Sequence, residues 1–415
     1  MDFHVDCLGA SREVGRSAFL LHTDRNIMID YGIKLFDESG DVKYPIPGPA
    51  KPDLVVLSHA HLDHSGCLPM LYNKGGMRWY STPPTKDICE VLWQDSLKIM
   101  GESAPYQPHD MKRALRHWDP LLYGHSIQSG DSRITMHDAG HIAGAAMVEI
   151  NYKGKNLVYT GDFKCEDTFM HKGARFLEGV DVLIMETTYA KKEHPPRKET
   201  EERLMEEIRD TIESGGNALL PSFALGRTQE LISLVRSYDQ EVPVFVDGMG
   251  RAITKIYMQY PKYIRNPEQF KKAVRNVNMI ESPQDRKQVL REPSVVISSA
   301  GMMNGGPMLN YMFHANSESR LMFTGFCVEG TNGWLLQNRN TVMVDDEEVD
   351  VELPVGYFDL SAHAGRSDIL EFIKRANPEK IVLVHGDLPE EFAIELGEEH
   401  GYDAIAPLPG ERVML

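Results

Sequence analysis

Three histidines and an aspartate fall within six residues, in the order His59-Ala-His-Leu-Asp-His64. A packed core could hold so many imidazoles and a carboxylate only at a high desolvation cost. The preceding residues, 52–58, form a short apolar run with β-branched side chains, which is typical of a buried strand that ends where the histidines begin. The pattern therefore predicts a metal site in a loop that follows a buried strand.

The same loop can serve two metal ions. In an extended segment His59 and His61 point the same way, whereas Asp63 and His64 follow the turn into the next helix and can face a second, displaced ion. A histidine-rich surface loop or a single adventitious site is the alternative interpretation. Because three imidazoles and a carboxylate directly follow a buried strand, the pattern favours the metal site.

The composition limits what kind of protein can carry this loop. The 415 residues, 42% of them hydrophobic and 25% charged, are typical of a globular protein with two domains or one large domain. There is no apolar run of about 18 residues, the length of a membrane span. The first residues lack the basic flank and apolar centre of a signal peptide. We therefore expect a cytoplasmic protein with no membrane partner.

The cysteine content and the net charge argue against two further classes of protein. The five cysteines are widely scattered and form no C-x-x-C pair, so we expect neither a disulfide framework nor a thiolate zinc site. The formal net charge of -17 argues against a protein that coats nucleic acid over its whole surface. Any contact with nucleic acid must therefore be local.

One segment has the charge for such a local contact. Residues 251–291 hold ten Lys or Arg against three acidic residues, a local charge of +7, and several aromatic residues lie between them. Lys271, Lys272 and Arg275 form its densest part. A solvated helical face and an RNA-binding surface explain this pattern equally well. Residues 345–352 carry the opposite charge, because most of them are acidic, and for this acidic run we expect an exposed linker or an edge strand.

The first part of the chain is strand-like. Up to about residue 185 the apolar segments are short and separated by polar, glycine-rich turns, which indicates a β-rich sandwich. The expected strands are 3–8, 17–22, 26–30, 54–58, 132–137, 146–150, 156–159 and 182–186, with helices at 85–100 and near 109–118.

From about residue 190 helices and buried strands alternate, which is typical of a parallel α/β unit. The expected elements are helices 200–214 and 228–238 with strands 218–220, 242–247, 294–298 and 320–325, followed by strands 357–361 and 380–385 around a helix 366–376.

Further candidate ligands follow the loop at 59–64. His141 lies among small residues that let a backbone approach an ion closely, and Asp162 ends an apolar strand. Taken singly, each would more often be a core histidine or a turn carboxylate. The same holds for four residues beside apolar strands or glycine-rich turns: Asp30, Glu186, His363 and His385.

Together these residues resemble a known family. The H-x-H-x-D-H motif, followed by His141, Asp162, Glu186, His363 and His385 in that order, resembles the motif series of metallo-β-lactamase-fold nucleases with a β-CASP insertion. Segments 220–230, 298–303 and 325–330 look like the RNA-cleaving subunit of the cleavage and polyadenylation specificity factor and its archaeal relatives, more than like ribonuclease J. The chain is similar to the shorter archaeal subgroup without KH domains, so we do not expect RNA selection by such domains.

The resemblance implies an α/β fold with a divided domain. Residues 1–188 and 355–415 would form a metallo-β-lactamase αββα sandwich, and residues 189–354 an inserted parallel α/β domain of β-CASP type. The inserted domain would close a cleft over single-stranded RNA.

The resemblance also implies roles for the candidate residues. His59, His61 and His141 would hold one ion, Asp63, His64 and His385 the other, and Asp162 would bridge them. Imidazole and carboxylate ligands without sulfur suit two Zn²⁺, with Mn²⁺ possible. Two ions would activate water for in-line attack on phosphorus, which counts Asp63 among the catalytic residues as well as the ligands.

The remaining roles concern residues beside the ions. His363 is the candidate general acid for the leaving ribose oxygen, and Glu186 would fix its tautomer and raise its pKa. Asp30 would hold a ligand histidine from behind. Arg227, Ser361 and the loop 298–303 can contact phosphates, although a structural role explains them nearly as well.

The expected function is that of a metal-dependent ribonuclease leaving 5′-phosphate and 3′-hydroxyl ends. Endonucleolytic cutting is the first choice and 5′-to-3′ exonuclease action the second, because both occur in the family that the chain resembles. A small-substrate hydrolase, such as a thioesterase or lactonase, and a catalytically inactive RNA-binding subunit are the alternatives from other classes. The former would need neither Glu186 nor His363, and the latter loses ligands that this chain keeps. A homodimer is implied by the resemblance alone.

Overall fold

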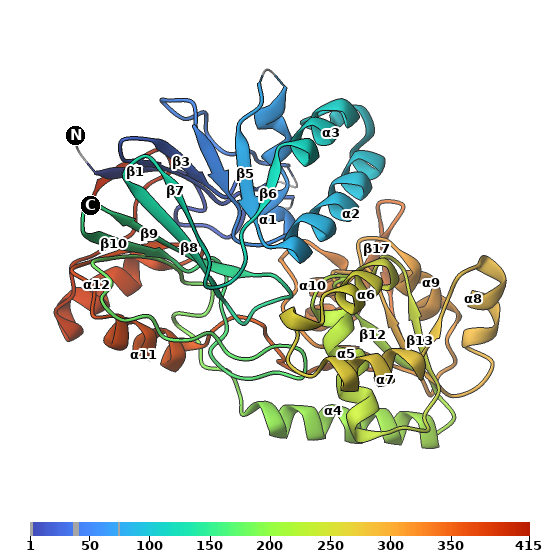
Figure 1. The fold of residues 1–415 in the computed structure, drawn as a ribbon. Helices are drawn as coiled ribbons and strands as arrows, with labels where there is room; N and C mark the ends of the chain where they lie inside the picture. The colour runs from blue at the N-terminus through green and yellow to red at the C-terminus, as the bar shows by residue number, and fades with distance from the viewer. Residues whose placement is uncertain (1–2, 36–40, 74) are drawn as a thin grey trace. The chain divides into compact units, whose positions relative to one another are not determined.

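The computed structural model describes residues 3–35, 41–73 and 75–415. The chain divides into two compact units (Figure 1). The first comprises the chain up to Asp167, then Lys172–Glu193 and Ala362–Leu415, and the second comprises Thr168–His171 and His194–Ser361. Among the helices of the described residues, none is long and apolar enough to cross a membrane.

The first unit is built on two mixed seven-stranded sheets. In spatial order the first sheet contains β22 (Arg412–Met414), β1 (His4–Gly9), β2 (Ala18–His22), β3 (Asn26–Ile29), β4 (Leu54–Val56), β5 (Arg78–Ser81) and β6 (Trp118–Pro120). The second contains β21 (Ala404–Ile405), β20 (Lys380–Val384), β11 (Val182–Glu186), β10 (Lys155–Tyr159), β9 (Ala146–Tyr152), β8 (Ser132–Asp138) and β7 (Ser126–Ser129). Strands β3 to β6 are parallel to one another, as are β10, β11, β20 and β21.

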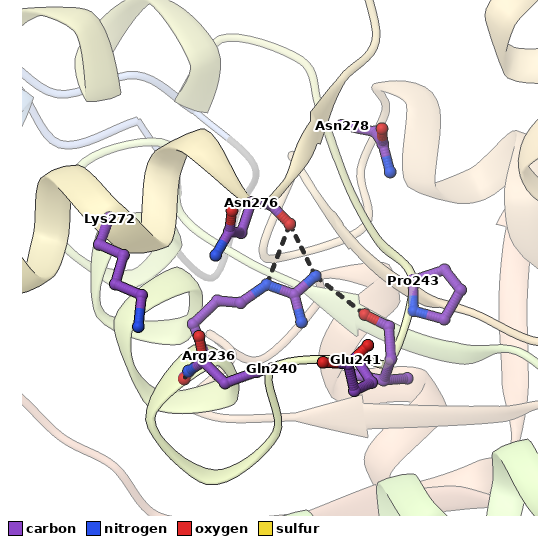
Figure 2. Close-up of a pocket in the computed structure, with 8 residues that line it drawn as sticks. Arg236, Gln240, Glu241, Pro243, Lys272, Asn276 and Asn278 are labelled. Atoms are coloured by element: carbon purple, nitrogen blue, oxygen red, sulfur yellow. Dashed lines mark hydrogen bonds between the residues drawn. The ribbon is translucent and has the colours of Figure 1, made fainter.

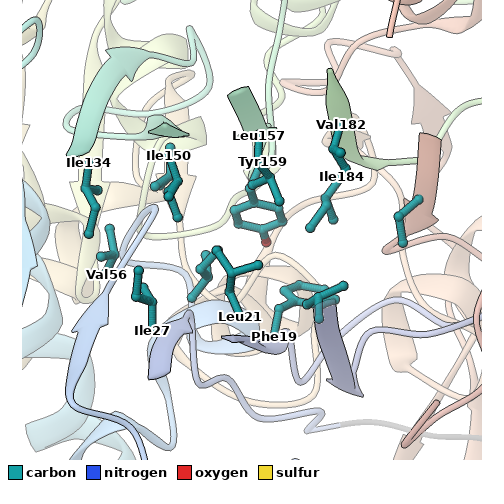
Figure 3. Close-up of a cluster of buried hydrophobic side chains, with 14 of the residues drawn as sticks. Phe19, Leu21, Ile27, Val56, Ile134, Ile150, Leu157, Tyr159, Val182 and Ile184 are labelled. Carbon is teal, nitrogen blue, oxygen red and sulfur yellow. The ribbon is translucent and has the colours of Figure 1, made fainter. Parts of the chain in front are cut away.

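The inner faces of the two sheets share one hydrophobic core (Figure 3). Phe19, Leu21 and Ile27 face it from the first sheet, and Ile150 and Ile184 from the second. These residues alternate with neighbours that point to the outer faces, as the period of two in a strand requires. The buried strands that the sequence predicts in the first 186 residues are therefore confirmed as the two halves of one sandwich.

Helices cover the outer faces of this sandwich. They are α1 (Leu62–Ser65), α2 (Pro83–Met100), α3 (Pro108–Arg116), α11 (Arg366–Ala376) and α12 (Pro389–His400), with short 3-10 turns at Leu68–Tyr72 and Gly101–Ser103. Trp93 of α2 packs against Trp79 of β5, with ring centroids 5.8 Å apart. Phe372 of α11 packs against Phe163, which follows β10, at 5.2 Å. The arrangement confirms the predicted αββα sandwich.

The second unit contains a six-stranded parallel sheet in the order β14-β13-β15-β12-β16-β19. Its strands are β12 (Ala218–Pro221), β13 (Val244–Asp247), β14 (Asn278–Met279), β15 (Val295–Ser298), β16 (Arg320–Phe323) and β19 (Val355–Tyr357). Its helices are α4 (Arg197–Glu213), α5 (Arg227–Tyr238), α6 (Gly250–Gln259), α7 (Pro267–Arg275), α8 (Pro283–Val289), α9 (Pro307–His314) and α10 (Asn332–Arg339), with a 3-10 turn at Pro261–Tyr263. The predicted parallel α/β unit is confirmed.

Two local predictions are decided by the strand bounds. The strand expected at 357–361 is wrong, because β19 covers Val355–Tyr357 and residues 358–361 belong to no strand. For the acidic run 345–352 the edge-strand alternative is confirmed and the linker alternative is wrong, because Glu347–Asp350 form the exposed strand β18 of a two-stranded sheet. The first residues of the run form the turn of a hairpin between β17 (Thr341–Val344) and β18 (Glu347–Asp350), with φ of 48° at Asp345 and 64° at Asp346.

Candidate metal centre

Five strand ends of the first unit meet at one edge of the sandwich. Asp30 follows β3, His59 lies just beyond β4, Asp162 follows β10, Glu186 ends β11 and His385 follows β20. Because parallel strands of one sheet present their carboxyl ends at the same edge, residues far apart in sequence converge there. Asp30 and His385 both have left-handed backbones, with φ of 57° and 50°, a conformation that costs a non-glycine residue about 1 kcal/mol.

A first cluster contains three imidazoles. His59, His61, His141 and Asp162 each offer one ligand atom, and these atoms all lie within 4.8 Å of one another. Nε2 of His141 lies 3.1 Å from Nδ1 of His61. The short extended segment before α1 places His59 and His61 in this cluster.

A second cluster lies beside the first. Asp63, His64, Asp162 and His385 meet the same 4.8 Å limit. Nε2 of His385 lies 3.2 Å from Oδ2 of Asp63. Asp63 and His64 belong to the single turn of α1, which rotates their side chains away from the direction of His59 and His61.

Asp162 belongs to both clusters, and its two oxygens face different partners. Oδ2 lies 3.4 Å from Nε2 of His59 and 3.8 Å from Nε2 of His141. Oδ1 lies 3.2 Å from Nε2 of His64 and 3.6 Å from Nδ1 of His385. One carboxylate is therefore positioned to serve two neighbouring cation sites.

The buried atoms of these clusters fit metal ions better than hydrogen bonds. Within the described residues, Nε2 of His59 and Oδ1 of Asp162 are buried and make no hydrogen bond. An unpaired buried polar atom of this kind is costly unless a ligand satisfies it. Two closely spaced sets of nitrogen and oxygen donors without sulfur are a composition that zinc and manganese accept.

The protonation states of the two clusters differ. Burial lowers the pKa of His59, His61 and His141, to about 3 for His61, so these imidazoles stay neutral with a lone pair available. Burial also opposes the protonation of His64 and His385, but the carboxylates of Asp162 and Asp63 outweigh it and raise their pKa. In this second cluster protons balance the carboxylates, and a divalent cation would displace them.

Asp30 lies behind the second cluster and contacts His64. Its Oδ2 accepts a hydrogen bond from Nδ1 of His64 at 2.7 Å, which leaves Nε2 of that ring facing Asp162. Asp30 also accepts bonds from the amide and hydroxyl of Ser58, both at 2.7 Å, and from the hydroxyl of Tyr159 at 2.9 Å. Sequence reasoning missed Ser58, which directly precedes His59, and Tyr159, which lies three residues before Asp162.

His363 and Glu186 form a pair beside the clusters, and one ligand atom of each lies within 4.8 Å of a carboxylate oxygen of Asp162. Nδ1 of His363 donates to Oε2 of Glu186 at 2.8 Å. Glu186 is held by two further donors, the amide of Phe163 at 2.8 Å and the hydroxyl of Thr188 at 2.6 Å. Thr188 was missed as well, although it lies only two residues from Glu186.

The pair keeps His363 protonated and partly accessible. Burial lowers the tendency of the ring to protonate, but the charges of Glu186 and Asp162 exceed that effect and raise the pKa of His363 from 6.5 to about 9. The His363 side chain is 21% exposed, whereas that of Glu186 is 2% exposed. A proton held on this imidazole is therefore within reach of a bound molecule.

The candidate RNA-binding residues all belong to the second unit, where they lie at opposite edges of its sheet. Arg227 begins α5 just beyond the carboxyl end of β12, and its guanidinium donates to the carbonyl of Leu360. Ser361 is buried, and its amide donates to Asp359. Lys271, Lys272 and Arg275 lie in the last turns of α7, which leads to the amino end of β14.

Lys272 lines a cavity of about 690 Å³ at that amino edge (Figure 2). Figure 2 shows Arg236 at its centre, with the guanidinium bonded to the carbonyls of Asn276 and Val242. Arg236 is thus bonded to carbonyls, whereas two other charged residues that line the cavity, Lys272 and Glu241, are exposed. The aromatic residues Tyr257 and Phe270 of the basic segment are buried and belong to the core.

A further cluster of titratable groups lies on β1 and β2. His4, Asp6 and His22 are close enough to hold an ion, and the rings of His4 and His22 stack at 4.3 Å. Arg412 of β22 donates to both oxygens of Asp6, at 2.8 and 3.2 Å. This guanidinium takes the place that a cation would need, so the cluster is an ion pair that fixes β22 to the sheet.

Three protein-family models match the chain. A metallo-beta-lactamase superfamily domain matches residues 20–193, a Beta-Casp domain residues 228–336, and a Zn-dependent metallo-hydrolase RNA specificity domain residues 348–407. The first and third cover the parts of the chain that carry the two clusters.

Several archaeal proteins are similar over most of the chain. Probable RNase MJ4 of Methanocaldococcus jannaschii is 36% identical, covering 98% of this chain and 99% of that protein. RNase aCSPSF2 of Saccharolobus solfataricus is 33% identical over 100% of this chain and 86% of that protein. Transcription termination factor FttA of Pyrococcus horikoshii is 33% identical over 96% of this chain and 69% of that protein.

A solved structure of low sequence identity is similar to this chain in its fold only. It is the crystal structure of a protein of unknown function from Enterococcus faecalis V583, with a TM-score of 0.65 at 15% identity over the whole of both chains.

Proposed function

This chain belongs to the β-CASP family of metallo-β-lactamase-fold proteins, and on that premise we propose that it is a metal-dependent ribonuclease acting on single-stranded RNA. The observation that carries the proposal is the position of Asp162, whose two oxygens face two separate sets of donors. A carboxylate shared in this way can hold two cations close enough together to act on one phosphoryl group. The names of the similar archaeal proteins, two of which are RNases, support RNA as the substrate.

We propose the same ligand sets that the family resemblance implies. His59, His61 and His141 would hold one cation, Asp63, His64 and His385 the second, and Asp162 both. Two Zn²⁺ are our choice, with Mn²⁺ as the alternative, because both accept imidazole and carboxylate donors. When bound, two such ions acidify a water molecule and neutralise charge that develops on the phosphoryl group.

The chain's own residues would position the ligands and move a proton. Asp30 accepts from Nδ1 of His64, which leaves Nε2 of that ring turned inward. The carbonyl of Ala362 accepts from Nδ1 of His141 at 2.8 Å, which leaves Nε2 of His141 turned inward as well. His363 would donate its proton from Nε2 to the leaving 3′-oxygen, because Nδ1 is held by Glu186. The products would carry 5′-phosphate and 3′-hydroxyl ends.

The alternative functions fit these residues less well. A small-substrate hydrolase has no use for the Glu186–His363 pair or for a second unit matched as a Beta-Casp domain. A catalytically inactive RNA-binding subunit would lack ligands, whereas each predicted ligand belongs to one of the two clusters. We therefore retain hydrolysis of RNA, with endonucleolytic cutting before 5′-to-3′ exonuclease action.

Cleavage of a labelled single-stranded RNA with and without a chelator tests this function. We expect a chelator to abolish cleavage, and about two equivalents of Zn²⁺ or Mn²⁺ per chain to restore it, as counted by elemental analysis. Activity that survives complete removal of the metal would contradict the proposal. Circular RNA, together with linear RNA bearing 5′-hydroxyl or 5′-triphosphate ends, separates the two modes. An endonuclease opens the circle, whereas an exonuclease leaves it intact.

The basic surface of α7 gives a separate prediction. Changing Lys271, Lys272 and Arg275 to Glu should weaken RNA binding and flatten its salt dependence, because each phosphate contact adds about 0.7 to the slope of log affinity against log salt. Losing three contacts should reduce that slope by about 2. The control changes three exposed lysines of the first unit to Glu: Lys153, Lys155 and Lys374. If both triple variants give the same slope of log affinity against log salt, the surface of α7 is a solvated helical face that does not contact RNA.

Three predictions stay as the sequence made them. We propose that the domains divide near residues 188 and 355, that the protein acts in the cytoplasm, and that it forms a homodimer. Sedimentation of the purified chain over a range of concentrations tests the last of these.

A further inference from the structure

Two exposed phenylalanines follow adjacent strands of the second unit. Phe223 is the second residue after β12 and is 41% exposed, and Phe326 is the third residue after β16 and is 57% exposed. β12 and β16 are parallel neighbours, with Leu219 paired to Leu321. Both rings therefore belong to the carboxyl edge of the sheet.

The chain leaves these two strands in opposite directions. From β12 it passes through α5 to β13, on one side in the sheet order, and from β16 through α10 to β19, on the other side. Because crossovers between parallel strands are right-handed, α5 and α10 cover opposite faces of the sheet. In open α/β sheets, such a point at the carboxyl ends of the strands is where ligands bind.

Contacts between the loops bring the two phenylalanines into one surface. Gly301 packs on Phe223, since a Cβ at Gly301 would lie 3.3 Å from Cγ of that ring. Cys327, the neighbour of Phe326, donates to the carbonyl of Gly301 at 3.8 Å. Gly325 faces the guanidinium of Arg227, with 3.8 Å from Nη2 to the place of a Cβ. We name Phe223, Arg227 and Phe326 the aromatic edge.

The loops around the aromatic edge are polar and rich in glycine. Asn304, Gly306, Glu329 and Gly330 are exposed there, so the two rings are not parts of a continuous apolar area. A protein partner or a second copy would need such an area to dock. Separate aromatic rings beside an arginine suit the flat faces of nucleobases, which stack on aromatic side chains and on guanidinium groups.

We propose that Phe223 and Phe326 each stack on a base of a bound single-stranded RNA, in a subsite of the second unit that tolerates any sequence. Arg227 adds positive charge beside the bases. This inference rests on the proposed function, because that function supplies RNA as the ligand. It differs from the basic surface of α7, which lies at the amino edge of the sheet and contacts phosphates without regard to bases.

Binding of a fluorescent single-stranded oligonucleotide, measured by anisotropy with a chelator present to prevent cleavage, tests the subsite. The double variant Phe223→Leu/Phe326→Leu keeps apolar side chains but removes the aromatic faces. We expect it to bind roughly 5- to 100-fold more weakly than the natural chain. The double variant with Tyr at both positions should bind normally. An abasic oligonucleotide of the same length should bind equally to all variants, since it offers phosphates without bases.

Phe313 provides the matched control, because it is 49% exposed but lies near the carboxyl end of α9, away from the aromatic edge. Phe313→Leu should leave binding within about 2-fold. Normal binding by the double Leu variant would overturn the inference, as would an equal loss of abasic binding. A changed oligomeric state in that variant would also overturn it, by making the surface a protein contact. Cleavage of RNA by the natural chain is scored in parallel, so failure of the proposed function is seen separately.

Discussion

Replacing Asp162 with Asn is expected to remove both metal ions and to lower RNA cleavage by at least ~10⁴-fold, which corresponds to about 5 kcal/mol of transition-state stabilisation. The reason is geometric, because each oxygen of this carboxylate faces a different cluster. An amide has nearly the same shape but offers one oxygen and no charge. Elemental analysis of the purified variant and cleavage of labelled RNA measure the two effects.

Asp181→Asn is the matched control for this substitution. Asp181 precedes β11, at the amino end of a strand in the same sheet, where its Oδ2 accepts from the amide of Asn156 at 2.6 Å. Its loss should leave metal content unchanged. If Asp162→Asn retains two equivalents of metal and full activity, the clusters are not the metal sites.

Replacing His363 with Ala should leave both ions bound and slow cleavage by roughly 10²- to 10⁴-fold, the usual contribution of general acid catalysis. His363 is a member of neither cluster and donates to Glu186 at 2.8 Å, so its removal takes no ligand from either cluster, although its ring lies 4.8 Å from that of His141. A sulfur in place of the bridging 3′-oxygen leaves without a proton. With that substrate the difference between the variant and the natural chain should nearly vanish.

His137→Ala is the matched control, because His137 pairs with Glu149 at the same 2.8 Å distance but belongs to neither cluster. It should change neither metal content nor cleavage. Loss of metal from His363→Ala would instead identify His363 as a ligand. If His363→Ala cleaves the sulfur-containing substrate more slowly than the natural chain by the same factor as ordinary RNA, then His363 positions the RNA rather than donating a proton.

Local patterns predicted the elements whose signals are complete within a few residues. The helix expected at 366–376 matches α11 at both ends, because Ile369, Phe372, Ile373 and Ala376 repeat at helical spacing. Strands β5 and β7 were not predicted, since each has only four residues with mixed polarity. Helix α12 was missed although proline opens it and Glu390 and Glu391 occupy its first turn.

The residues that hold the clusters in place show the limit of such patterns. Tyr159 bonds to Asp30 across 129 positions of the chain, and Thr188 lies 3.3 Å from Nδ1 of His385 across 197. Nothing in the sequence near either residue indicates these contacts, because they depend on which strands become neighbours.

The sequence alone determined which chemical groups follow the strands and in what order, because a strand's apolar run and the polar residues after it are local features. It also indicated a β-rich sandwich and a parallel α/β unit, since hydrophobic periodicity distinguishes the two. Only the tertiary structure decided that each oxygen of Asp162 faces its own set of imidazoles. It also separated Arg227 from Lys272 at opposite edges of one sheet. Strand order and direction fix such distances, and neither can be read from residues that are close in sequence.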